Sequence, residues 1–165
     1  MDNYIFKQAN TTDVDKVLKL IQKRIKWMEE HNINQWKDNY FKSYPKEYFE
    51  EKVFKGQLFV MKVEVSDYII GAVTLSEEDS YWDDNTQSCY IHNLVSDIEA
   101  SGIGTKIIAF SEKVATESGV NIIRLDCQAS NDKLNSYYYK LGFQLVGTVK
   151  DGDYIGNKRE KKLNF

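Results

Sequence analysis

Residues 89–104 read Cys-Tyr-Ile-His-Asn-Leu-Val-Ser-Asp-Ile-Glu-Ala-Ser-Gly-Ile-Gly, and this stretch decides the fold. Its first part, residues 89–95, is apolar and β-rich and predicts a strand. The turn Ser101-Gly102-Ile103-Gly104 then opens a helix that Gly119 ends, and residues 122–127 predict a second strand. Strand, glycine turn, helix and strand in this order predict a right-handed crossover between parallel strands. The apolar positions of the helix are Ile103, Ile107, Phe110 and Val114.

The segments before residue 89 predict a long helix and an antiparallel hairpin. Residues 4–9 predict a first strand, and Thr12 followed by Asp15 is typical of a cap at the start of a helix that runs to about residue 31. Further along we expect, in order, an ordered loop over residues 32–45, a short helix over 48–54, and strands over 58–65 and 68–75 joined by the turn Ser66-Asp67. The core-facing positions of the long helix are Val14, Val17, Leu18, Ile21, Ile25 and Met28.

The last third of the chain completes the expected sheet. Residues 131–141 predict a short helix that Gly142 closes, and residues 143–149 and 160–165 predict a last pair of strands. There is no repeat, low-complexity tract or linker, so we expect residues 1–165 to form a single domain. The fold class that follows is α/β (α+β), with a mixed, mostly antiparallel sheet that contains one parallel strand pair and is flanked by helices.

Composition excludes several classes of partner. The 165 residues carry 25 acidic and 22 basic side chains, mixed along the chain for a net charge of -3, so no basic stripe indicates nucleic-acid binding. Residues 1–6 lack the apolar core of a signal peptide, and no stretch approaches the roughly 18 apolar residues that span a bilayer. We therefore expect a soluble protein without a membrane partner, located in the cytoplasm.

The two cysteines indicate neither a disulfide framework nor a metal site. Cys89 and Cys127 lie far apart in apolar runs without CxxC spacing, and the two histidines form no cluster with them. Neither has the basic or helix-terminal setting that activates a thiol. We therefore expect both to be buried packing residues in a reducing compartment, and we expect no metal.

The turn Ser101-Gly102-Ile103-Gly104-Thr105 predicts an anion site. A turn that opens a helix directly after a strand points several backbone N–H groups and the positive end of the helix dipole at one spot. Glycine leaves room for a phosphate, and Thr105 adds a hydroxyl donor. Many such turns are only tight connections, and neither a GxGxxG nor a GxxxxGK[ST] motif is present. The phosphate-bearing ligand would therefore be something other than a dinucleotide or a nucleoside triphosphate.

A second motif completes the pattern. Asn131 is followed by Tyr137-Tyr138 and then by Gly142-Phe143, after a glycine-turn helix start preceded by Tyr-Ile-His-Asn-Leu-Val. This arrangement resembles the Gcn5-related N-acetyltransferase (GNAT) superfamily. The resemblance is close over residues 91–143 and covers the whole chain in the order of its elements.

The resemblance implies a fold, a cosubstrate and a set of residues. The fold would be the single-domain GNAT fold, with the parallel strand pair at the site of acetyl-coenzyme A. Backbone groups at Leu94 and Val95 would pair with the pantetheine arm and steady the thioester oxygen, and Asn131 would hydrogen-bond the cofactor. Tyr138 would protonate the departing thiolate. The pyrophosphate would lie on Glu99, Ala100, Ser101, Gly102, Ile103, Gly104 and Thr105. The superfamily usually has Gln or Arg where this chain has Glu99.

The chemistry of acyl transfer is consistent with these roles. Attack of a neutral amine on a thioester creates an oxyanion, which N–H donors stabilise, and expels a thiolate whose conjugate thiol has a pKa of about 8.5. A phenol with a pKa near 10 can protonate it. Because neither cysteine is activated, we expect direct attack by the amine.

Several assignments stay open. Tyr138 shares a helix face with Leu134 and Leu141 and by spacing alone would be a core residue. His92 could be a polar residue on the other face of its strand. The general base is unassigned, with the run Glu77, Glu78 and Asp79 and the isolated Asp126 as candidates that could instead be ordinary surface acids. Six aromatic residues could frame a pocket for a cationic amine or simply pack: Trp27, Trp36, Tyr40, Tyr44, Tyr81 and Trp82.

The function expected from the sequence is N-acetyl transfer from acetyl-coenzyme A to a primary amine of a small molecule or a protein. The alternative is a non-catalytic module that binds or senses an acyl-coenzyme A, for which Glu99 is the positive hint, whereas Tyr138 favours the enzyme. A pure interaction domain would bind no coenzyme A. The identity of the amine is not encoded in a readable motif, and homodimerisation, which is common in the superfamily, stays open.

Overall fold

The computed structural model describes residues 3–33, 36 and 40–164. Within these residues no helix is long and apolar enough to cross a membrane. A 3-10 turn over Thr11–Asp13 leads into the first helix. The helices and strands are β1 (Tyr4–Gln8), α1 (Val14–Glu30), α2 (Tyr40–Ser43), α3 (Lys46–Phe54), β2 (Leu58–Val63), β3 (Ile69–Ser76), β4 (Cys89–Ser96), α4 (Ile103–Glu117), β5 (Ile122–Gln128), α5 (Asp132–Lys140), β6 (Gln144–Asp151) and β7 (Tyr154–Lys162).

Across the described residues, seven strands form one mixed sheet in the order β1-β2-β3-β4-β5-β7-β6. Strands β4 and β5 are parallel, with Cys89 opposite Ile123 and Tyr90 opposite Arg124. The β1–β2, β2–β3, β5–β7 and β6–β7 pairs are antiparallel. A parallel pair needs a crossover connection, which α4 provides. The predicted α/β fold with one parallel strand pair is therefore confirmed.

The chain groups into two compact units. The first consists of Met1–Leu75 and His92–Phe110, and the second of Ser76–Ile91 and Ser111–Phe165. Strand β4 and helix α4 each contribute residues to both units. That residues 1–165 form a single domain stays a prediction.

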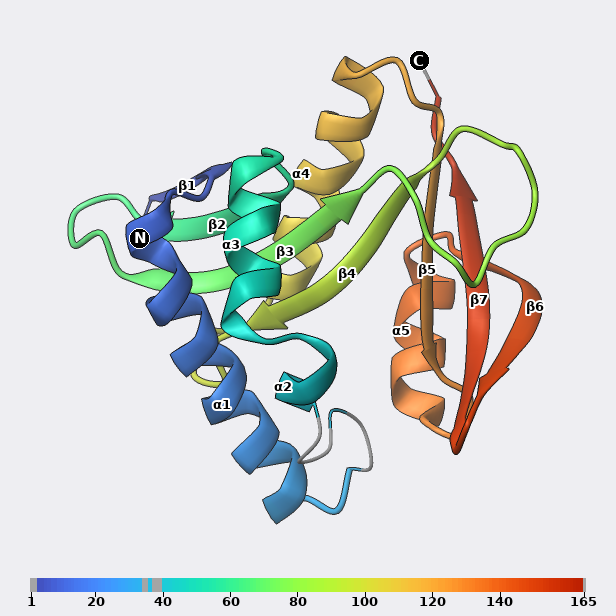
Figure 1. The fold of residues 1–165 in the computed structure, drawn as a ribbon, viewed down its shortest axis with the longest axis horizontal. Helices are drawn as coiled ribbons and strands as arrows, with labels where there is room; N and C mark the ends of the chain where they lie inside the picture. The colour runs from blue at the N-terminus through green and yellow to red at the C-terminus, as the bar shows by residue number, and fades with distance from the viewer. Residues whose placement is uncertain (1–2, 34–35, 37–39, 165) are drawn as a thin grey trace. The chain divides into compact units, whose positions relative to one another are not determined.

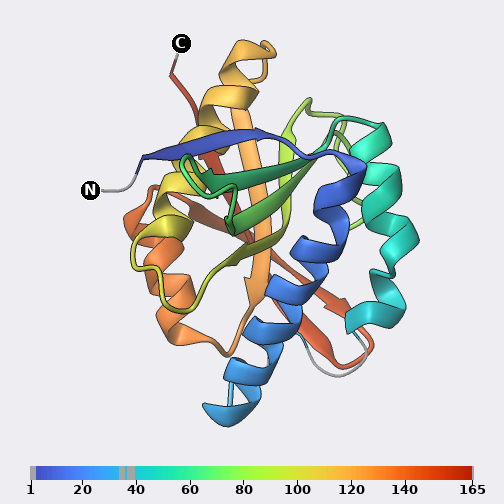
Figure 2. The same cartoon turned by 90° about the vertical axis from the view of Figure 1, so that its left-hand side faces the viewer.

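In the first unit, helices cover both faces of strands β1 to β3 (Figures 1 and 2). Leu58 and Val60 of β2 belong to the hydrophobic core that α1 and α3 share. The ring of Phe59 instead stacks on Phe6, and Phe6 stacks on Phe110 of α4. Because successive side chains of a strand point to opposite faces, almost all of β2 is buried.

Helix α1 is confirmed, but its cap was predicted wrongly. The side-chain oxygen of Asn10 accepts a hydrogen bond from the Thr12 N–H at 3.0 Å, and the carboxylate of Asp13 accepts one from the Asn10 N–H at 2.9 Å. This reciprocal pair caps the 3-10 turn, which the helical pattern does not reveal. Leu18 and Met28 are only half-buried. The buried positions of α1 are Val14, Val17, Leu20, Ile21 and Ile25.

The connection after α1 contains more helix than predicted. Helix α2 lies inside the segment expected to be a loop, and residues 34–35 and 37–39 of that loop lie outside the described residues. Helix α3 begins at Lys46, directly after Pro45, rather than at Tyr48. Proline is well tolerated at a helix start because its missing N–H would have no partner there.

The β2–β3 hairpin turns earlier than predicted. The strands end at Val63 and resume at Ile69, so the connection is longer than the two residues expected. The pairing register shifts between Met61 and Lys62, and Asp67 adopts a φ of 57°. Asp is among the few residues that tolerate this left-handed conformation.

The buried face of α4 is rotated from the predicted one. Phe110 is 37% exposed and covers Phe6 at the β1 side, and Val114 is half-buried. The apolar pattern did not predict Ser111, a polar residue that is fully buried. The buried residues of α4 are Ile103, Ile107, Ile108, Ser111 and Ala115.

In the second unit, α5 packs beside the antiparallel strands β5, β7 and β6 (Figure 1). Strand β7 starts at Tyr154, six residues before the predicted start, because the chain reverses at Gly152 with a φ of 59°. Asp151 pairs with Tyr154 across this turn. Asp-Gly is a strong hairpin signal, so the sequence did contain the information that would have corrected this boundary.

A buried ion pair in the first unit yields a prediction about stability. Lys62 Nζ lies 2.9 Å from Asp13 Oδ1 and 3.1 Å from Asp67 Oδ1, and the side chains of Lys62 and Asp13 are 5% and 1% exposed. Asp13→Asn should lower the free energy of unfolding by about 3 kcal/mol, because it leaves a buried ammonium with one exposed partner. Asp67→Asn, the matched control, should cost less than about 1 kcal/mol. Urea denaturation measures both, and equal losses would contradict this account.

Candidate functional site

The turn between β4 and α4 has the geometry predicted for an anion site. Gly102 has a φ of 79°, and a Cβ added to it would meet nothing within 4 Å, so backbone conformation rather than crowding requires glycine. The first helical hydrogen bond shown here runs from Lys106 N–H to the Gly102 carbonyl at 3.3 Å. A helix start of this kind can bind an anion through its backbone N–H groups and the positive end of the helix dipole. Glu99, Ser101 and Thr105 are exposed, so a ligand can reach the turn.

Asp97 anchors the start of this turn. Its carboxylate accepts hydrogen bonds from Tyr68 Oη at 2.7 Å, from Glu99 N at 3.0 Å and from Lys23 Nζ at 3.2 Å. Burial alone would raise its pKa, but these hydrogen bonds outweigh burial and lower it, so Asp97 is ionised. Arg24 of α1 adds a bond to the carbonyl of Ser96 at 2.6 Å. The sequence reasoning missed this anchor, whose donors lie up to 74 residues away.

Gly71 allows α4 to approach strand β3 closely. A Cβ at Gly71 would lie 2.4 Å from Ile107 Cδ1 and 3.2 Å from both Ile103 Cγ2 and the carbonyl oxygen of Val95. A side chain at this position would require Ile107 to shift and would crowd the carbonyl of Val95. Gly71 therefore favours the close approach of β3 to the helix that begins at the glycine turn, a role that no local sequence pattern signals.

Strand β4 is irregular beside the predicted pantetheine site. Asn93 has a φ of 55°, which is unusual inside a strand. Its side-chain amide donates to Tyr40 Oη at 2.6 Å and accepts from Tyr48 Oη at 2.8 Å. Leu94 and Val95 follow directly, half-buried and buried respectively. Two tyrosines of α2 and α3 thus hold the backbone conformation that precedes the predicted cofactor residues.

Tyr138 lies on α5 in the second unit, where it is buried and contacts two other aromatic rings. It is 7% exposed, and its ring centroid lies 5.3 Å from that of Tyr137 and 5.9 Å from that of Phe143. Burial raises its pKa above the ordinary value of a phenol, so it holds its proton at neutral pH. Within the described part of the chain its hydroxyl has no hydrogen-bond partner. A protonated and uncommitted hydroxyl can donate to a ligand.

Asn131 caps the N-terminus of α5, where its side-chain oxygen accepts a hydrogen bond from the Leu134 N–H at 3.1 Å. Its predicted contact with the cofactor is a separate role and stays a prediction. The position of α5 is fixed by Asn135, a residue that the sequence reasoning did not single out. The Asn135 oxygen accepts from Asn157 Nδ2 at 2.9 Å and from Arg159 Nε at 3.1 Å. This buried pairing holds the helix that carries Tyr138 against β7.

Two of the candidate bases lie close together in the second unit. A carboxylate oxygen of Asp79 and one of Asp126 lie within 4.8 Å of each other. Asp126 also accepts a hydrogen bond from Tyr154 Oη at 2.5 Å. Glu77 and Glu78 are exposed. Asp79 therefore differs from its exposed neighbours Glu77 and Glu78 by lying beside Asp126. His92 is half-buried on β4, and its role stays open.

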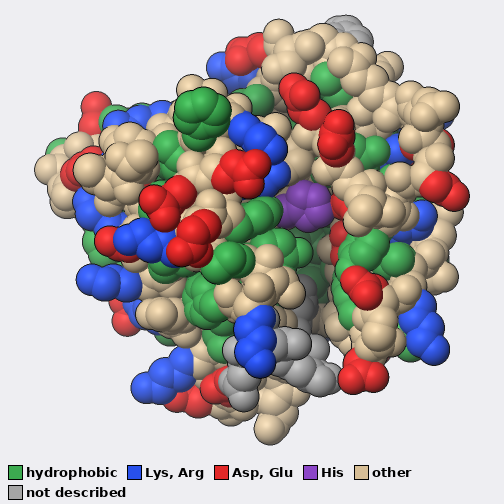
Figure 3. All heavy atoms as spheres, in the orientation of Figure 1, with side chains coloured by type: hydrophobic (Ala, Val, Ile, Leu, Met, Phe, Trp, Pro, Cys, Tyr) green, Lys and Arg blue, Asp and Glu red, His purple; other side chains and the backbone are tan. Residues whose placement is uncertain are grey.

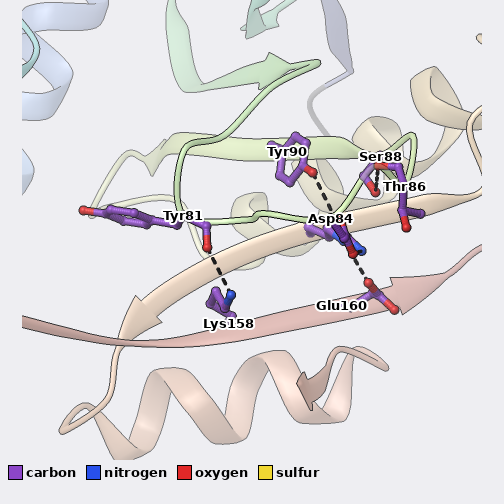
Figure 4. A network of polar contacts seen from close by, with 8 residues as sticks. Tyr81, Asp84, Thr86, Ser88, Tyr90, Lys158 and Glu160 are labelled. Atoms are coloured by element: carbon purple, nitrogen blue, oxygen red, sulfur yellow. Dashed lines mark hydrogen bonds and ion pairs between the residues drawn. The ribbon is translucent and has the colours of Figure 1, made fainter. Parts of the chain in front are cut away.

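An arginine network ties the acidic loop between β3 and β4 to the sheet of the second unit. Arg124 on β5 makes two bonds of 2.8 Å to the carboxylate of Asp84 and one of 2.8 Å to Glu160 on β7. Figure 4 shows Asp84 and Glu160 from close by. The guanidinium lies 4.3 Å from the centroid of the Trp82 ring. The Arg124 bonds lower the pKa of Asp84 to about 2, so this attachment persists at neutral pH.

The same network borders a cavity of about 470 Å³ in the second unit. Lys158 at its edge donates to the carbonyl oxygen of Tyr81 at 3.0 Å (Figure 4). Both basic and acidic side chains line the cavity, so it favours no single sign of charge. The lining residues are Trp82, Asp83, Asp84, Thr86, Ile122, Arg124, Val146, Lys158, Glu160 and Lys162.

Both cysteines are free and unsuited to nucleophilic catalysis. Burial raises the pKa of Cys89 to about 12 and that of Cys127 to about 11. At neutral pH both thiols are therefore protonated and weakly nucleophilic. Cys127 is buried as expected, whereas Cys89 is half-buried.

The aromatic residues after α1 form a contiguous row in the first unit. Ring centroids are 5.0 Å apart for Trp36 and Tyr40, 4.9 Å for Tyr40 and Tyr44, and 4.9 Å for Tyr44 and Tyr48. Tyr40 is buried, so part of the row is core. On the face drawn in Figure 3, acidic and basic side chains are interspersed, in agreement with the mixed charges of the sequence.

Comparison with known proteins identifies the family. The model of the acetyltransferase (GNAT) family matches residues 25–143. A curated relative, named the uncharacterized N-acetyltransferase YesJ of Bacillus subtilis (strain 168), is 24% identical over 166 residues, which cover 95% of this chain and 91% of the relative.

Solved structures share the fold. A GNAT-family acetyltransferase from Listeria monocytogenes 4b F2365 superposes with a TM-score of 0.81 at 27% identity, covering 97% of this chain and 95% of the other. The PaiA N-acetyltransferase from Thermoplasma acidophilum, solved in complex with coenzyme A, superposes with a TM-score of 0.71 at 20% identity, covering 97% of this chain and 99% of the other. The family match spans most of the chain, including the glycine turn and Tyr138. The chain belongs to the acetyltransferase (GNAT) family.

Proposed function

We propose that this acetyltransferase transfers the acetyl group of acetyl-coenzyme A to a primary amine of a small molecule or a protein by direct attack. The observation that carries the proposal is the prepared turn between β4 and α4. Asp97 and Gly102 fix its backbone, and Glu99, Ser101 and Thr105 are exposed, so a pyrophosphate can reach the start of α4. The relative YesJ is named an N-acetyltransferase, which supports an amine as the acceptor.

The proposed reaction forms one bond and breaks another. The lone pair of a neutral amine attacks the thioester carbonyl carbon, which forms a C–N bond and leaves an oxyanion that backbone N–H groups at Leu94 and Val95 would stabilise. Collapse of this intermediate breaks the C–S bond. The thiolate takes the proton of the Tyr138 hydroxyl, and the amine loses its extra proton to water or to a carboxylate. A proton from the solvent then restores the Tyr138 hydroxyl. Asp126 and Asp79 are the candidates for that carboxylate.

The properties of this chain support direct attack. An acyl-enzyme route would need a reactive thiolate, and both cysteines have raised pKa values. Tyr138 is protonated and unpaired within the described residues, as the donor to a leaving thiolate must be. The two free cysteines also fit a reducing compartment, and we propose the cytoplasm.

Binding of coenzyme A is the first test of this proposal. A ligand that binds only the native state stabilises it by about 2.7 kcal/mol at a hundred times its Kd, which should raise Tm by several degrees in a chain of this size. We expect acetyl-coenzyme A to give such a shift at micromolar to sub-millimolar concentration. The absence of any shift at millimolar acetyl-coenzyme A would refute the proposal. A shift without acetyl transfer to any amine would instead favour the non-catalytic acyl-coenzyme A module.

A further inference from the structure

The predicted pyrophosphate turn carries a negative charge of its own. Glu99 lies at the start of the turn, and its side chain is 82% exposed. A carboxylate at this position should repel phosphates, although water and salt limit such a pairwise effect to about 1 kcal/mol or less. The N–H groups of the turn and the helix dipole have to overcome this repulsion, unless a cation elsewhere offsets it.

A cation from α1 lies beside this turn. Lys23 Nζ lies 3.2 Å from Asp97 Oδ1 and 4.0 Å from Glu99 Oε2. Asp97 is buried and fixed by Tyr68 and by a backbone N–H, so it holds the ammonium firmly. The contact with Glu99 is at the limit of an ion pair and lies in solvent, where such pairs contribute little. Lys23 thus has one strong attachment and one weak one.

We infer that Lys23 is a further cofactor-binding residue, which supplies from α1 the positive charge that position 99 of the turn lacks. The inference rests on the proposed function. In the free protein Lys23 partly neutralises Glu99. When coenzyme A binds, the Lys23 ammonium exchanges the carboxylate of Glu99 for an oxygen of the pyrophosphate and keeps its bond to Asp97. Lysine binds phosphate as a mobile point charge, and its side chain, 39% exposed here, has the freedom to make this exchange.

Other roles of Lys23 predict different behaviour. If Lys23 only held Asp97 in place, its loss would disturb the turn in the same way as the loss of Tyr68, the other side chain that bonds to Asp97. Such a disturbance changes geometry and is insensitive to salt. A direct interaction of Lys23 with a phosphate is instead screened by ions, because the Debye length falls from about 10 Å at 0.1 M to about 3 Å at 1 M salt.

The test is a titration of coenzyme A into the full chain at low and high ionic strength. We expect Lys23→Gln to weaken binding about three- to tenfold at low salt, with the loss shrinking toward none in 1 M salt. Lys23→Arg should retain most of the affinity, and Tyr68→Phe should give a loss that does not depend on salt. Lys26→Gln, which removes the same charge from an exposed position on α1, is the matched control and should change little.

Two further titrations assign the interaction to the pyrophosphate. Dephospho-coenzyme A lacks the 3′-phosphate, so the loss caused by Lys23→Gln should be the same with this probe. Glu99→Gln should tighten binding several-fold at low salt, because it removes the repulsion and the competing partner of Lys23.

The inference about Lys23 would be overturned by an unchanged affinity in Lys23→Gln, by a loss that persists in 1 M salt, or by a loss that disappears with dephospho-coenzyme A. Failure of the wild-type chain to bind coenzyme A would instead refute the proposed function, so the two failures are distinguishable.

Discussion

Tyr138→Phe should lower kcat about 10² to 10⁴-fold while leaving the affinity for coenzyme A nearly unchanged. The substitution removes the proton that the departing thiolate needs, and general acid catalysis contributes a factor of this size. Stability should hardly change, because the Tyr138 ring keeps its contacts with Tyr137 and Phe143 and its hydroxyl loses no hydrogen bond among the described residues. Steady-state kinetics by thiol release, with Tm as the measure of folding, tests this prediction.

Tyr139→Phe is the matched control, because Tyr139 lies on the same helix and is 61% exposed. It should leave kcat within about twofold of the wild type, as is usual for exposed positions away from the chemistry. The raised pKa of Tyr138 adds a pH test with a defined sign. Because a phenol with a raised pKa stays protonated through the alkaline range, the acid should be lost only above about pH 10. If Tyr138→Phe turned over as fast as the wild type, Tyr138 would be a packing residue and not the general acid.

Gly104→Glu should abolish the thermal shift that acetyl-coenzyme A produces. Gly104 is the second residue of α4, beside the turn whose N–H groups would hold the pyrophosphate. Glutamate adds bulk and a negative charge at that point, and both oppose a bound phosphate. The fold should survive, because glutamate is a better helix former than glycine by roughly 0.5 to 1 kcal/mol. Circular dichroism and the Tm without ligand check the fold, and titration checks binding.

Gly104→Gln separates the two causes, since it adds nearly the same bulk without the charge. We expect it to weaken binding less than Gly104→Glu does, and we expect the difference between the two variants to shrink at high salt. A thermal shift in Gly104→Glu as large as in the wild type would mean that acetyl-coenzyme A binds somewhere other than this turn.

Local patterns in the sequence predicted most of the architecture. The crossover from β4 through α4 to β5 followed from a strand, a glycine turn and helical periodicity, each of which depends on residues close together in the chain. The errors have local causes too. Phe110 was assigned to the core because it is apolar, yet it covers the ring of Phe6 at the edge of α4. Strand β7 was started too late because the turn signal Asp151-Gly152 was overlooked.

Local sequence patterns could not predict the long-range contacts that hold the residues of the candidate site in place. Lys23 meets Asp97 across 74 positions of the chain, and Arg124 meets Asp84 across 40. Such contacts are decided by how the sheet is ordered, which no short window of sequence contains. Buried polar groups such as Asn135 show the same limitation. Hydrophobic periodicity would place Asn135 on the surface, and only its bonds to β5 and β7 explain why it is buried.

The catalytic assignment and the family membership rest on different observations. Membership follows from the match over residues 25–143, whereas the roles of Tyr138, Lys23 and the glycine turn are proposals that experiments on this chain must test. If the chain binds coenzyme A through the turn but shows no turnover, the proposed pyrophosphate site stands and the proposed acetyl transfer is refuted.

The most direct test of the central claim is a thiol-release assay of the wild-type chain with acetyl-coenzyme A and a panel of primary amines, with mass spectrometry of the products. The account predicts that at least one amine gains an acetyl group in step with the release of coenzyme A, and that Tyr138→Phe suppresses this release by two orders of magnitude or more. Release of coenzyme A without an N-acetylated product, or no release with any amine although acetyl-coenzyme A binds, would contradict the account.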